Sequence, residues 1–424
     1  MPKFVDSHID WLGFVPEDWV VERLQWHLKE INIKNNPIQT TNVLSLTNKL
    51  GVIPYEEKGN QGNKSKDNYD EYKVAYKDTI VANSMNILIG SVGYSNYYGC
   101  VSPVYYVFKE SNGDNLRFIN YIMQTTQFQR ELRKYANGIL EIRLRVSASD
   151  ILKRMCAFPP IGIQNTIADF LDEKCSEIDS LYADIQAELD TLNEYRDSVI
   201  SEAVTHGVDN ASLRDSGVEW CPTVPEHWLY TNPKALFKLR NQRASEGERQ
   251  LTASQEYGIV YQDDFMEMTG NKVVTVEKDF SILKHVEPND FVISMRSFQG
   301  GLEYSELRGS ISSAYVMLIP DENQVYPPFY RWFFKSSKYI NAIQSTTNLV
   351  RDGQAMRYAN FLKVPLFIIP VEEQKKIAEY LDLTVKEIDD IRTKKQEQLD
   401  ILEQYKKSII FEYVTGKKEV PING

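Results

Sequence analysis

The chain contains two long segments in which apolar residues recur every three or four positions, the spacing of a helix with one apolar stripe. After Pro160 the stripe consists of Leu171, Ile178, Leu181, Ile185, Leu192, Tyr195 and Val199. After Pro370 it consists of Leu381, Ile388, Ile391, Leu399, Leu402, Tyr405 and Ile409. Neither segment contains a further proline, and Gly207 and Gly416 mark their ends. The pattern predicts two helices of about 44 residues, each roughly 65 Å long.

A helix of this length with a narrow apolar stripe needs a partner, and the chain carries two similar stripes. We therefore predict that the two helices pair within the chain as a coiled coil. The pairing is expected to be antiparallel, because the intervening block must return the chain to the far end of the first helix. The alternative is that each helix packs separately on its own neighbouring block.

The regions outside these helices mix strand-like and helix-like patterns, which predicts two α/β blocks. Runs rich in β-branched and aromatic residues predict strands at 78–82, 85–89, 101–108, 290–294 and 314–319. Helices are predicted at 116–135 and 328–343, and polar stretches predict loops at 56–72 and 241–257.

The sequence also repeats itself with an offset of about 210 residues. Residues 160–205 and 370–415 match without gaps, with about 19 identities in 46 positions. Shorter matches pair Leu44 with Leu251, Asp78 with Asp290, and Gly99 with Gly309. Segments 6–19 and 215–228 share two tryptophans, and all four, Trp11, Trp19, Trp220 and Trp228, are predicted to anchor the cores. The chain is thus a tandem duplication.

The repeat predicts the fold class and the domain boundaries. We expect an α+β protein in which two mixed α/β domains are separated by two long helices, with pseudo-two-fold symmetry. The first domain is assigned to 1–158 and the first helix to 159–207. The second domain is assigned to 208–368, and the second helix with the C-terminal tail to 369–424.

The distribution of charge changes the picture given by the net charge of −11. Residues 160–206 hold about 11 acidic and 2 basic side chains, so much of the excess acidity lies in the first helix. The two large blocks are close to neutral, and each can present a basic face. Nucleic-acid binding is therefore not excluded. The contents of hydrophobic residues (42%) and charged residues (25%) are those of a globular protein.

The search for chemistry finds no catalytic group. The four cysteines (Cys100, Cys156, Cys175 and Cys221) are far apart, which predicts a reducing cytoplasm rather than a disulfide scaffold or a zinc module. No apolar run is long enough to span a bilayer, and the first residues lack a basic-then-apolar leader. No phosphate-binding loop and no nucleophile–base set is found. We predict no active site, no metal and no cofactor in this chain.

The repeated motifs resemble those of the specificity subunits of type I restriction–modification enzymes. They comprise Asp6-Ser7 with Trp11, Val15-Pro16 and Trp19, Leu44-Ser45 with Gly51-Val52, the run from Asp290 to Ser294, and Pro370 with Gln374, Ile377, Leu381 and Asp382. The last phrase recurs as Pro160, Gln164, Ile167, Leu171 and Asp172. The likeness covers the whole chain. The family's acid before the glutamine is present as Glu373 but is replaced by Ile163, which puts the start of the first helix in doubt.

The resemblance implies that each block is a target recognition domain that reads one part of a split, asymmetric site in double-stranded DNA. The helices would set the distance between the parts and dock the modification subunits. Half-sites one DNA turn apart lie roughly 34–36 Å from each other, and a stiff helix pair can fix such a distance. Adenine methylation would come from the modification subunits, and ATP-dependent cleavage from restriction/translocase subunits. S-adenosylmethionine, ATP and Mg are expected in those partners.

Phosphate contacts are expected from basic side chains in polar loops, and base contacts from Arg, Gln, Asn and Ser. The candidates in the first domain are Lys58, Lys64, Lys66, Asn86, Ser91, Tyr94, Asn96, Arg143 and Arg145. The candidates in the second domain are Arg240, Arg243, Arg296, Ser297, Gln299, Arg351, Gln354 and Arg357. For each of them, a solvated side chain or a salt-bridge partner is an equally open interpretation.

An alternative function is a scaffold of two protein-binding modules on a coiled-coil ruler, without DNA. Salt-dependent binding to a duplex distinguishes the two functions, because release of counterions makes the affinity for DNA fall with salt.

Overall fold

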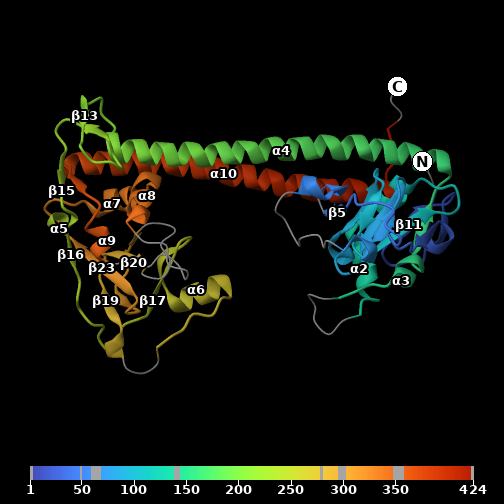
Figure 1. Cartoon of the computed structure of the whole chain (residues 1–424), viewed down its shortest axis with the longest axis horizontal. Helices are drawn as coiled ribbons and strands as arrows, with labels where there is room; N and C mark the ends of the chain where they lie inside the picture. Colours follow the sequence, from blue (N-terminus) through green and yellow to red (C-terminus); the bar gives the residue numbers. More distant parts are fainter. Residues whose placement is uncertain are drawn as a thin grey trace. The chain divides into compact units, whose positions relative to one another are not determined.

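The computed structural model of this chain describes residues 3–47, 50–58, 68–137, 144–276, 280–294, 302–346 and 358–421. It divides into two compact units, which consist of Met1–Ile185 with Gln396–Gly424, and of Gln186–Lys395. We call them unit 1 and unit 2. Each contains one mixed α/β block and a part of both long helices, α4 (Ile161–His206, green in Figure 1) and α10 (Val371–Val414, red). The predicted α+β fold with two blocks and two long helices is confirmed.

Unit 1 is built on a four-stranded antiparallel sheet whose residues alternate between two cores. Its strand order is β4 (Leu28–Ile31), β11 (Tyr105–Glu110), β8 (Thr79–Asn83), β9 (Val92–Ser95). Along β8, Ile80 and Ala82 face the core shared with α1 (Leu116–Gln124) and α2 (Thr126–Arg133), whereas Val81 faces a smaller core. The period of two is that of a strand covered on both faces.

Two-stranded ladders and short helices complete unit 1. The ladders pair β1 (Phe4–Asp6) with β2 (Phe14–Pro16), β3 (Val20–Arg23) with β12 (Met155–Phe158), β5 (Leu44–Thr47) with β6 (Gly51–Pro54), and β7 (Lys73–Ala75) with β10 (Gly99–Val101). The short helices are α3 (Ala148–Leu152), η1 (Leu24–Trp26), η2 (Tyr55–Lys58), η3 (Tyr69–Glu71) and η4 (Ile87–Ile89).

Unit 2 repeats this plan. Its sheet order is β16 (Phe237–Leu239), β23 (Tyr315–Pro320), β20 (Phe291–Ser294), β21 (Glu303–Tyr304). Its ladders pair β13 (Leu213–Asp215) with β14 (Thr223–Pro225), β15 (Leu229–Thr231) with β24 (Leu366–Ile368), β17 (Leu251–Ser254) with β18 (Gly258–Tyr261), and β19 (Lys284–Val286) with β22 (Gly309–Ile311). The helices of the block are α5 (Pro233–Leu236), α6 (Gln262–Thr269), η6 (Phe280–Ile282), α7 (Pro327–Phe333), α8 (Ser337–Ser345) and α9 (Tyr358–Phe361).

The two blocks correspond in the structure with one shift from the sequence match. The backbone N–H of Asp78 donates to the carbonyl of Ser95, and that of Asn289 donates to the carbonyl of Ser305. Asp78 and Asn289 both have a positive φ. Asp78 therefore corresponds to Asn289, and Thr79 to Asp290. The sequence match of Asp78 with Asp290 is wrong by one residue, because the strand ladder rather than residue identity fixes the register.

Several predicted elements are interrupted. The predicted helix at 116–135 is two helices, because Thr125 adopts an extended backbone and its hydroxyl accepts a hydrogen bond from the N–H of Phe128 as the cap of α2. The predicted helix at 328–343 is likewise divided before α8, at the extended Ser336. The predicted strand at 101–108 is broken by a turn in which the N–H of Tyr105 bonds to the carbonyl of Ser102.

Two further sequence predictions are corrected. Residues 85–89 are not a strand, because the Asn83 side chain accepts from the N–H of Met85 and starts a turn that leads into η4. The predicted loop at 241–257 contains β17. The core role of the tryptophans holds: Trp11, Trp19 and Trp228 are buried, and Trp220 packs edge-on against Phe333 with ring centroids 5.7 Å apart.

The end of α10 closes unit 1 against the first residues of the chain. Gly416 follows α10 with a left-handed backbone, and a Cβ at this position would clash with Pro16 and lie against Trp19. The ammonium group of Lys417 donates to the carbonyl of Leu12, 2.6 Å away. Residues separated by about four hundred positions thus belong to one core.

The two long helices are antiparallel within each unit. In unit 1, the Lys406 ammonium lies 2.6 Å from the Asp179 carboxylate, and the ring centroids of Phe170 and Tyr413 are 4.6 Å apart. In unit 2, Arg196 Nε lies 3.3 Å from Asp389 Oδ1, and Lys395 pairs with Glu188. In both, the residue number on α10 falls as that on α4 rises. The predicted antiparallel pairing is confirmed within each unit.

Candidate functional site

Both units use one buried glutamine to attach a long helix to its block. Gln164 donates to Asp114 Oδ1 at 2.8 Å and to the carbonyl of Pro159 at 3.0 Å, and it accepts from the N–H of Asn115. Gln374 donates to the carbonyls of Gln324 and Ile369 and accepts from the N–H of Tyr326. The exposed fractions of the two side chains are 2% and 0%. The repeated glutamine therefore has a structural role in both copies.

A half-buried lysine and a glycine are also shared. Lys73 donates to the carbonyl of Tyr105 at 2.8 Å, and Lys284 donates to the carbonyl of Tyr315 at 2.6 Å. Burial lowers the pKa of both ammonium groups. Gly99, like its counterpart in β22, lies so close to a neighbouring backbone carbonyl that a Cβ would overlap it. These contacts hold the ladders beside the sheet, and they are the scaffold that the two units have in common.

The predicted DNA-binding residues of unit 1 fall into two groups. Asn86, Asn96 and Arg145 are exposed, and half-buried Lys58 lies with its ammonium 4.7 Å above the centre of the Tyr55 ring. These four stay predictions as DNA contacts. The sulfur of Met85 accepts a hydrogen bond from Arg145 Nη2 at 3.7 Å, which joins the turn after β8 to the segment before α3.

Two other predicted residues of unit 1 are engaged in the fold. Ser91 is only 2% exposed, and its backbone bonds to Asn83 and Asn86. We therefore correct its assignment as a DNA contact. The Tyr94 hydroxyl donates to the Asp78 carboxylate, and burial together with this hydrogen bond raises the pKa of Tyr94 to about 12. The hydroxyl of Tyr94 is thus committed to Asp78.

The predicted candidate Arg240 of unit 2 forms a buried ion pair. Its Nε and Nη2 donate to the two oxygens of Asp290 at 2.6 and 2.9 Å. The exposed fractions of the two side chains are 14% and 1%. Burial raises the pKa of Asp290, and the bidentate guanidinium opposes that rise. We correct the assignment of Arg240 as a DNA contact, because its donors hold the turn before β20 instead.

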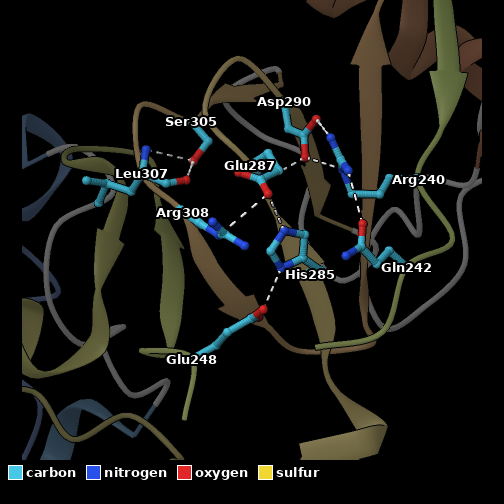
Figure 2. A network of polar contacts seen from close by, with 9 residues as sticks. All are labelled: Arg240, Gln242, Glu248, His285, Glu287, Asp290, Ser305, Leu307 and Arg308. Carbon is cyan, nitrogen blue, oxygen red and sulfur yellow. Dashed lines mark hydrogen bonds and ion pairs between the residues drawn. The ribbon is translucent and has the colours of Figure 1, made fainter. Parts of the chain in front are cut away.

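Figure 2 shows how this pair continues into a larger network around His285. The imidazole is fully buried, with Nδ1 2.8 Å from Glu248 and Nε2 2.8 Å from Glu287. Burial by itself lowers the pKa of His285, but the hydrogen bonds and charges of the two glutamates raise it overall above the ordinary value of 6.5. Arg308 Nε lies 3.5 Å from Glu287, and Asp290 accepts from the N–H of Glu287.

The remaining candidates of unit 2 are mostly beyond the described residues. Arg243 is exposed and donates to the carbonyl of Ile282 at 3.3 Å. It stays a prediction. Nine predicted residues in the two units lie outside the described residues, namely Lys64, Lys66, Arg143, Arg296, Ser297, Gln299, Arg351, Gln354 and Arg357.

The helix pair confirms part of the predicted seam and corrects the rest. Leu171, Ile178, Leu381, Ile388, Leu399 and Ile409 are buried, and Ile185, Leu192, Val199 and Leu402 are half-buried. Four predicted members are exposed instead, with exposed fractions of 52%, 54%, 46% and 54% for Leu181, Tyr195, Ile391 and Tyr405. A seam between two helices advances in alternating steps of three and four residues. At each of these four places, that spacing puts the next residue of the chain in the seam instead, namely Tyr182, Arg196, Arg392 and Lys406.

Sequence reasoning missed Arg196, Arg392 and Lys406 because it searched for apolar side chains. The long stems of arginine and lysine pack in the seam while their charged ends reach carboxylates beside it. Arg392 pairs with Asp389 at 2.6 Å, and Lys406 pairs with Asp179. Cys175, Leu189 and Val385 are buried members that were also missed. A strict count of alternating three- and four-residue steps from Gln164 and Gln374 finds all of them.

No three His, Cys, Asp or Glu side chains in the described ranges are placed together as metal ligands. Within the same ranges, no helix has the length and apolar character needed to cross a membrane. All four cysteines are free and buried.

Comparison with known proteins identifies relatives of this chain. Residues 16–190 match the family model described as Type I restriction modification DNA specificity domain. The chain is 25% identical over 309 residues to the putative type I restriction enzyme MjaX specificity subunit of Methanocaldococcus jannaschii, covering 69% of this chain and 66% of that protein. It is 28% identical over 137 residues to the type I restriction enzyme EcoKI specificity subunit of Escherichia coli, covering 31% and 29%. Each alignment spans less than two thirds of the relative.

Solved structures share the fold. A chain from a structure on the assembly and conformational transition of the type I R-M system matches with a TM-score of 0.71 at 11% identity. That match covers 95% of this chain and 99% of the other. The HsdS subunit from Thermoanaerobacter tengcongensis matches with a TM-score of 0.51 at 11% identity, covering 95% and 98%. The resemblance predicted from the repeated motifs is confirmed.

Proposed function

We propose that this chain is the non-catalytic DNA-recognition subunit of a type I restriction–modification complex, because residues 16–190 match the type I restriction modification DNA specificity domain and the chain resembles a type I specificity subunit over 309 residues. Each unit reads one part of a bipartite, asymmetric site in double-stranded DNA. The helices set the spacing between the two parts and dock the methyltransferase subunits. The chain acts in the cytoplasm, where its free thiols stay reduced.

One observation carries this proposal: the two units share a scaffold but differ in their polar residues. The same sheet order, the same buried glutamine and the same half-buried lysine occur in both. The ionic network around His285 in unit 2 has no counterpart at the corresponding Val74 of unit 1. Two similar scaffolds that carry different polar residues suit the reading of two different sequences on one duplex.

The outer side of the helix pair supports docking of a partner protein. Unit 1 exposes Leu181 and Tyr405, and unit 2 exposes the equivalent Ile391 and Tyr195. At these equivalent positions each unit offers an aliphatic and a tyrosine side chain, which suits one copy of the same partner per unit. Residues 160–206 carry about 11 acidic against 2 basic side chains, so this helix repels DNA phosphates and favours a protein partner.

We place the chemistry in the partner subunits. Adenine methylation would use S-adenosylmethionine in the modification subunits, and translocation and cleavage would use ATP and Mg in the restriction subunits. The role of this chain is to position these partners by reading DNA. Its own side chains supply recognition rather than a reacting group.

The test is to produce the full chain with its methyltransferase partner subunits and to measure duplex binding and methylation. We expect one bipartite motif with two unlike halves among the methylated sites of the host genome. The affinity for a duplex carrying that motif should fall steeply as salt rises from 50 to 200 mM. A complex that assembles but neither binds duplexes in this way nor methylates a bipartite motif would favour the protein-scaffold alternative.

A further inference from the structure

A small exposed ledge of unit 1 brings together side chains from two separate segments. The ledge consists of Met85 and Asn86, in the turn after β8, and of Asn137 and Arg145, which flank the segment before α3. All four residues are exposed, and the exposed fraction of Met85 is 37%. The sulfur of Met85 accepts from Arg145 Nη2 at 3.7 Å, so the two segments meet at this point.

The backbone beneath the ledge is held rigidly. Asn137 and Arg145 exchange both backbone hydrogen bonds, at 2.8 and 2.9 Å. The N–H of Val146, a fully buried residue, donates to the carbonyl of Ser84, which joins this bridge to the turn. The buried side chain of Asn83 accepts from the N–H of Met85 at 3.0 Å. A rigid base lowers the entropy cost of presenting exposed side chains to a ligand.

Arg145 differs in its contacts from three arginines that the fold binds through carboxylates. Arg117 bonds to two aspartates, Arg154 lies 3.7 Å from Glu131, and Arg240 forms the bidentate pair with Asp290. For Arg145, by contrast, the structure records a sulfur contact and no carboxylate among the described residues. Its guanidinium therefore keeps strong donors for a ligand, held near one orientation by a weak acceptor.

The chemistry of the ledge matches the edges of DNA bases in the major groove. An arginine fork bonds to guanine O6 and N7, and an asparagine amide bonds to adenine N6 and N7. An apolar group such as the methionine side chain can contact the thymine methyl group. Ser91 and Tyr94, which the sequence also favoured, lack free groups for this task because the fold engages them.

We infer that Arg145, Asn86, Asn137 and Met85 form the base-reading surface of unit 1, with Arg145 as the main determinant of its half-site. This inference rests on the function proposed above and adds which residues choose the bases. Arg145 reads a guanine, the two asparagines read neighbouring adenines, and Met85 holds the guanidinium in place.

The experiment compares the methylated motif of the full complex with that of Arg145→Ala, Arg145→Lys and Asn86→Ala variants. Arg145→Ala should lose preference for one base in one half of the motif, by about 5-fold to 150-fold, and leave the other half unchanged. Arg145→Lys keeps the charge but not the bidentate fork, so it should broaden the same position. Asn86→Ala should broaden a different position of the same half.

Arg23→Ala is the matched control, since Arg23 is an exposed arginine of unit 1 on the separate strand β3. It should leave the motif unchanged, and thermal unfolding should show that all variants are folded. Weaker binding of Arg145→Ala at every sequence, with an unchanged motif and a smaller salt dependence, would overturn the inference and make Arg145 a phosphate contact. A wild-type complex without a bipartite motif would instead overturn the proposed function.

Discussion

Unit 1 and unit 2 have different residues at the same packed position. At the start of β8, unit 1 has Thr79, whose hydroxyl donates to the carbonyl of Tyr76 at 2.6 Å. Unit 2 has Asp290, whose carboxylate is bound by Arg240. The strand ladders place Ile31 at the position of Arg240. A neutral pair in one copy thus corresponds to a buried ion pair in the other.

The difference teaches which contacts the fold requires. The contacts of Gln164 and Gln374 recur in both copies, so the scaffold depends on them. A buried ion pair is weak evidence for stability, because desolvation of the two charges offsets their attraction. The presence of Thr79 in unit 1 shows that the fold forms without such a pair. The network around His285 is therefore a feature of unit 2 alone, and four sets of substitutions test this comparison.

The largest effect is expected from Asp290→Ala. It leaves the mostly buried Arg240 guanidinium without its partner, at a cost of about 3–5 kcal/mol in the stability of unit 2. The double variant Arg240→Ile with Asp290→Thr, which installs the residues of unit 1, should cost less than half as much. Hydrogen exchange read by mass spectrometry resolves the two units. A double variant as unstable as the single one would show that unit 2 needs the ion pair.

Removal of the shared glutamines should lower the stability of each unit by less than Asp290→Ala does, and by a similar amount in both units. Gln164→Ala and Gln374→Ala each leave a half-buried backbone N–H without its acceptor, at up to about 1–3 kcal/mol for each unfilled group. Gln164→Ala should increase exchange at the start of α4 and near Asn115, and Gln374→Ala should do so at the start of α10 and near Tyr326. Unequal losses in the two variants would contradict the view that both units depend on the same attachment.

The pH dependence of stability should distinguish the units. The folded-state pKa of His285 is raised above 6.5. The ion pairs of the imidazolium therefore stabilise unit 2 fully below about pH 6.5, and this contribution is lost as the pH rises through the folded-state pKa. Unit 2 should exchange faster relative to unit 1 between pH 6.5 and pH 9, after correction for intrinsic exchange. His285→Val, which installs the residue of unit 1, should remove the difference.

The smallest effect is expected at the corrected seam positions. Leu181→Ser removes an exposed side chain and should change the stability of unit 1 by less than about 0.5 kcal/mol. Ile178→Ala, one turn away in the buried seam, is the comparison and should cost several times more. Urea unfolding of the full chain measures both. A large loss for Leu181→Ser would restore the original seam assignment.

Much of the fold was predictable because repeated local patterns and the long-range structure agree. The helices around Leu171 and Leu381 follow from periodicity, and the duplication aligns the two blocks. The exact seam was not predictable from apolarity, since Arg196 and Lys406 pack through their stems while Leu181 faces solvent. The sequence match of Asp78 with Asp290 gave the wrong register, because the backbone hydrogen bonds of the two sheets align Asp78 with Asn289.

The candidate site was less predictable than the fold, because residue type does not show what a side chain contacts. Arg145 and Arg240 are the same residue in similarly polar stretches of sequence. One is exposed beside a sulfur atom, and the other is enclosed by Asp290. This difference depends on which carboxylate the fold brings within reach, and that partner lies 50 positions along the chain from Arg240.

The contact of Lys417 with the first residues of the chain has a consequence for biosynthesis. Unit 2 is one continuous stretch, Gln186–Lys395, so a nascent chain can complete it as soon as that stretch has left the ribosome. Unit 1 begins first, yet its core waits for Ile409, Tyr413 and the residues beyond them. The half of the protein that is translated earliest is thus completed last, and its unfinished apolar surface is the one that a chaperone would meet.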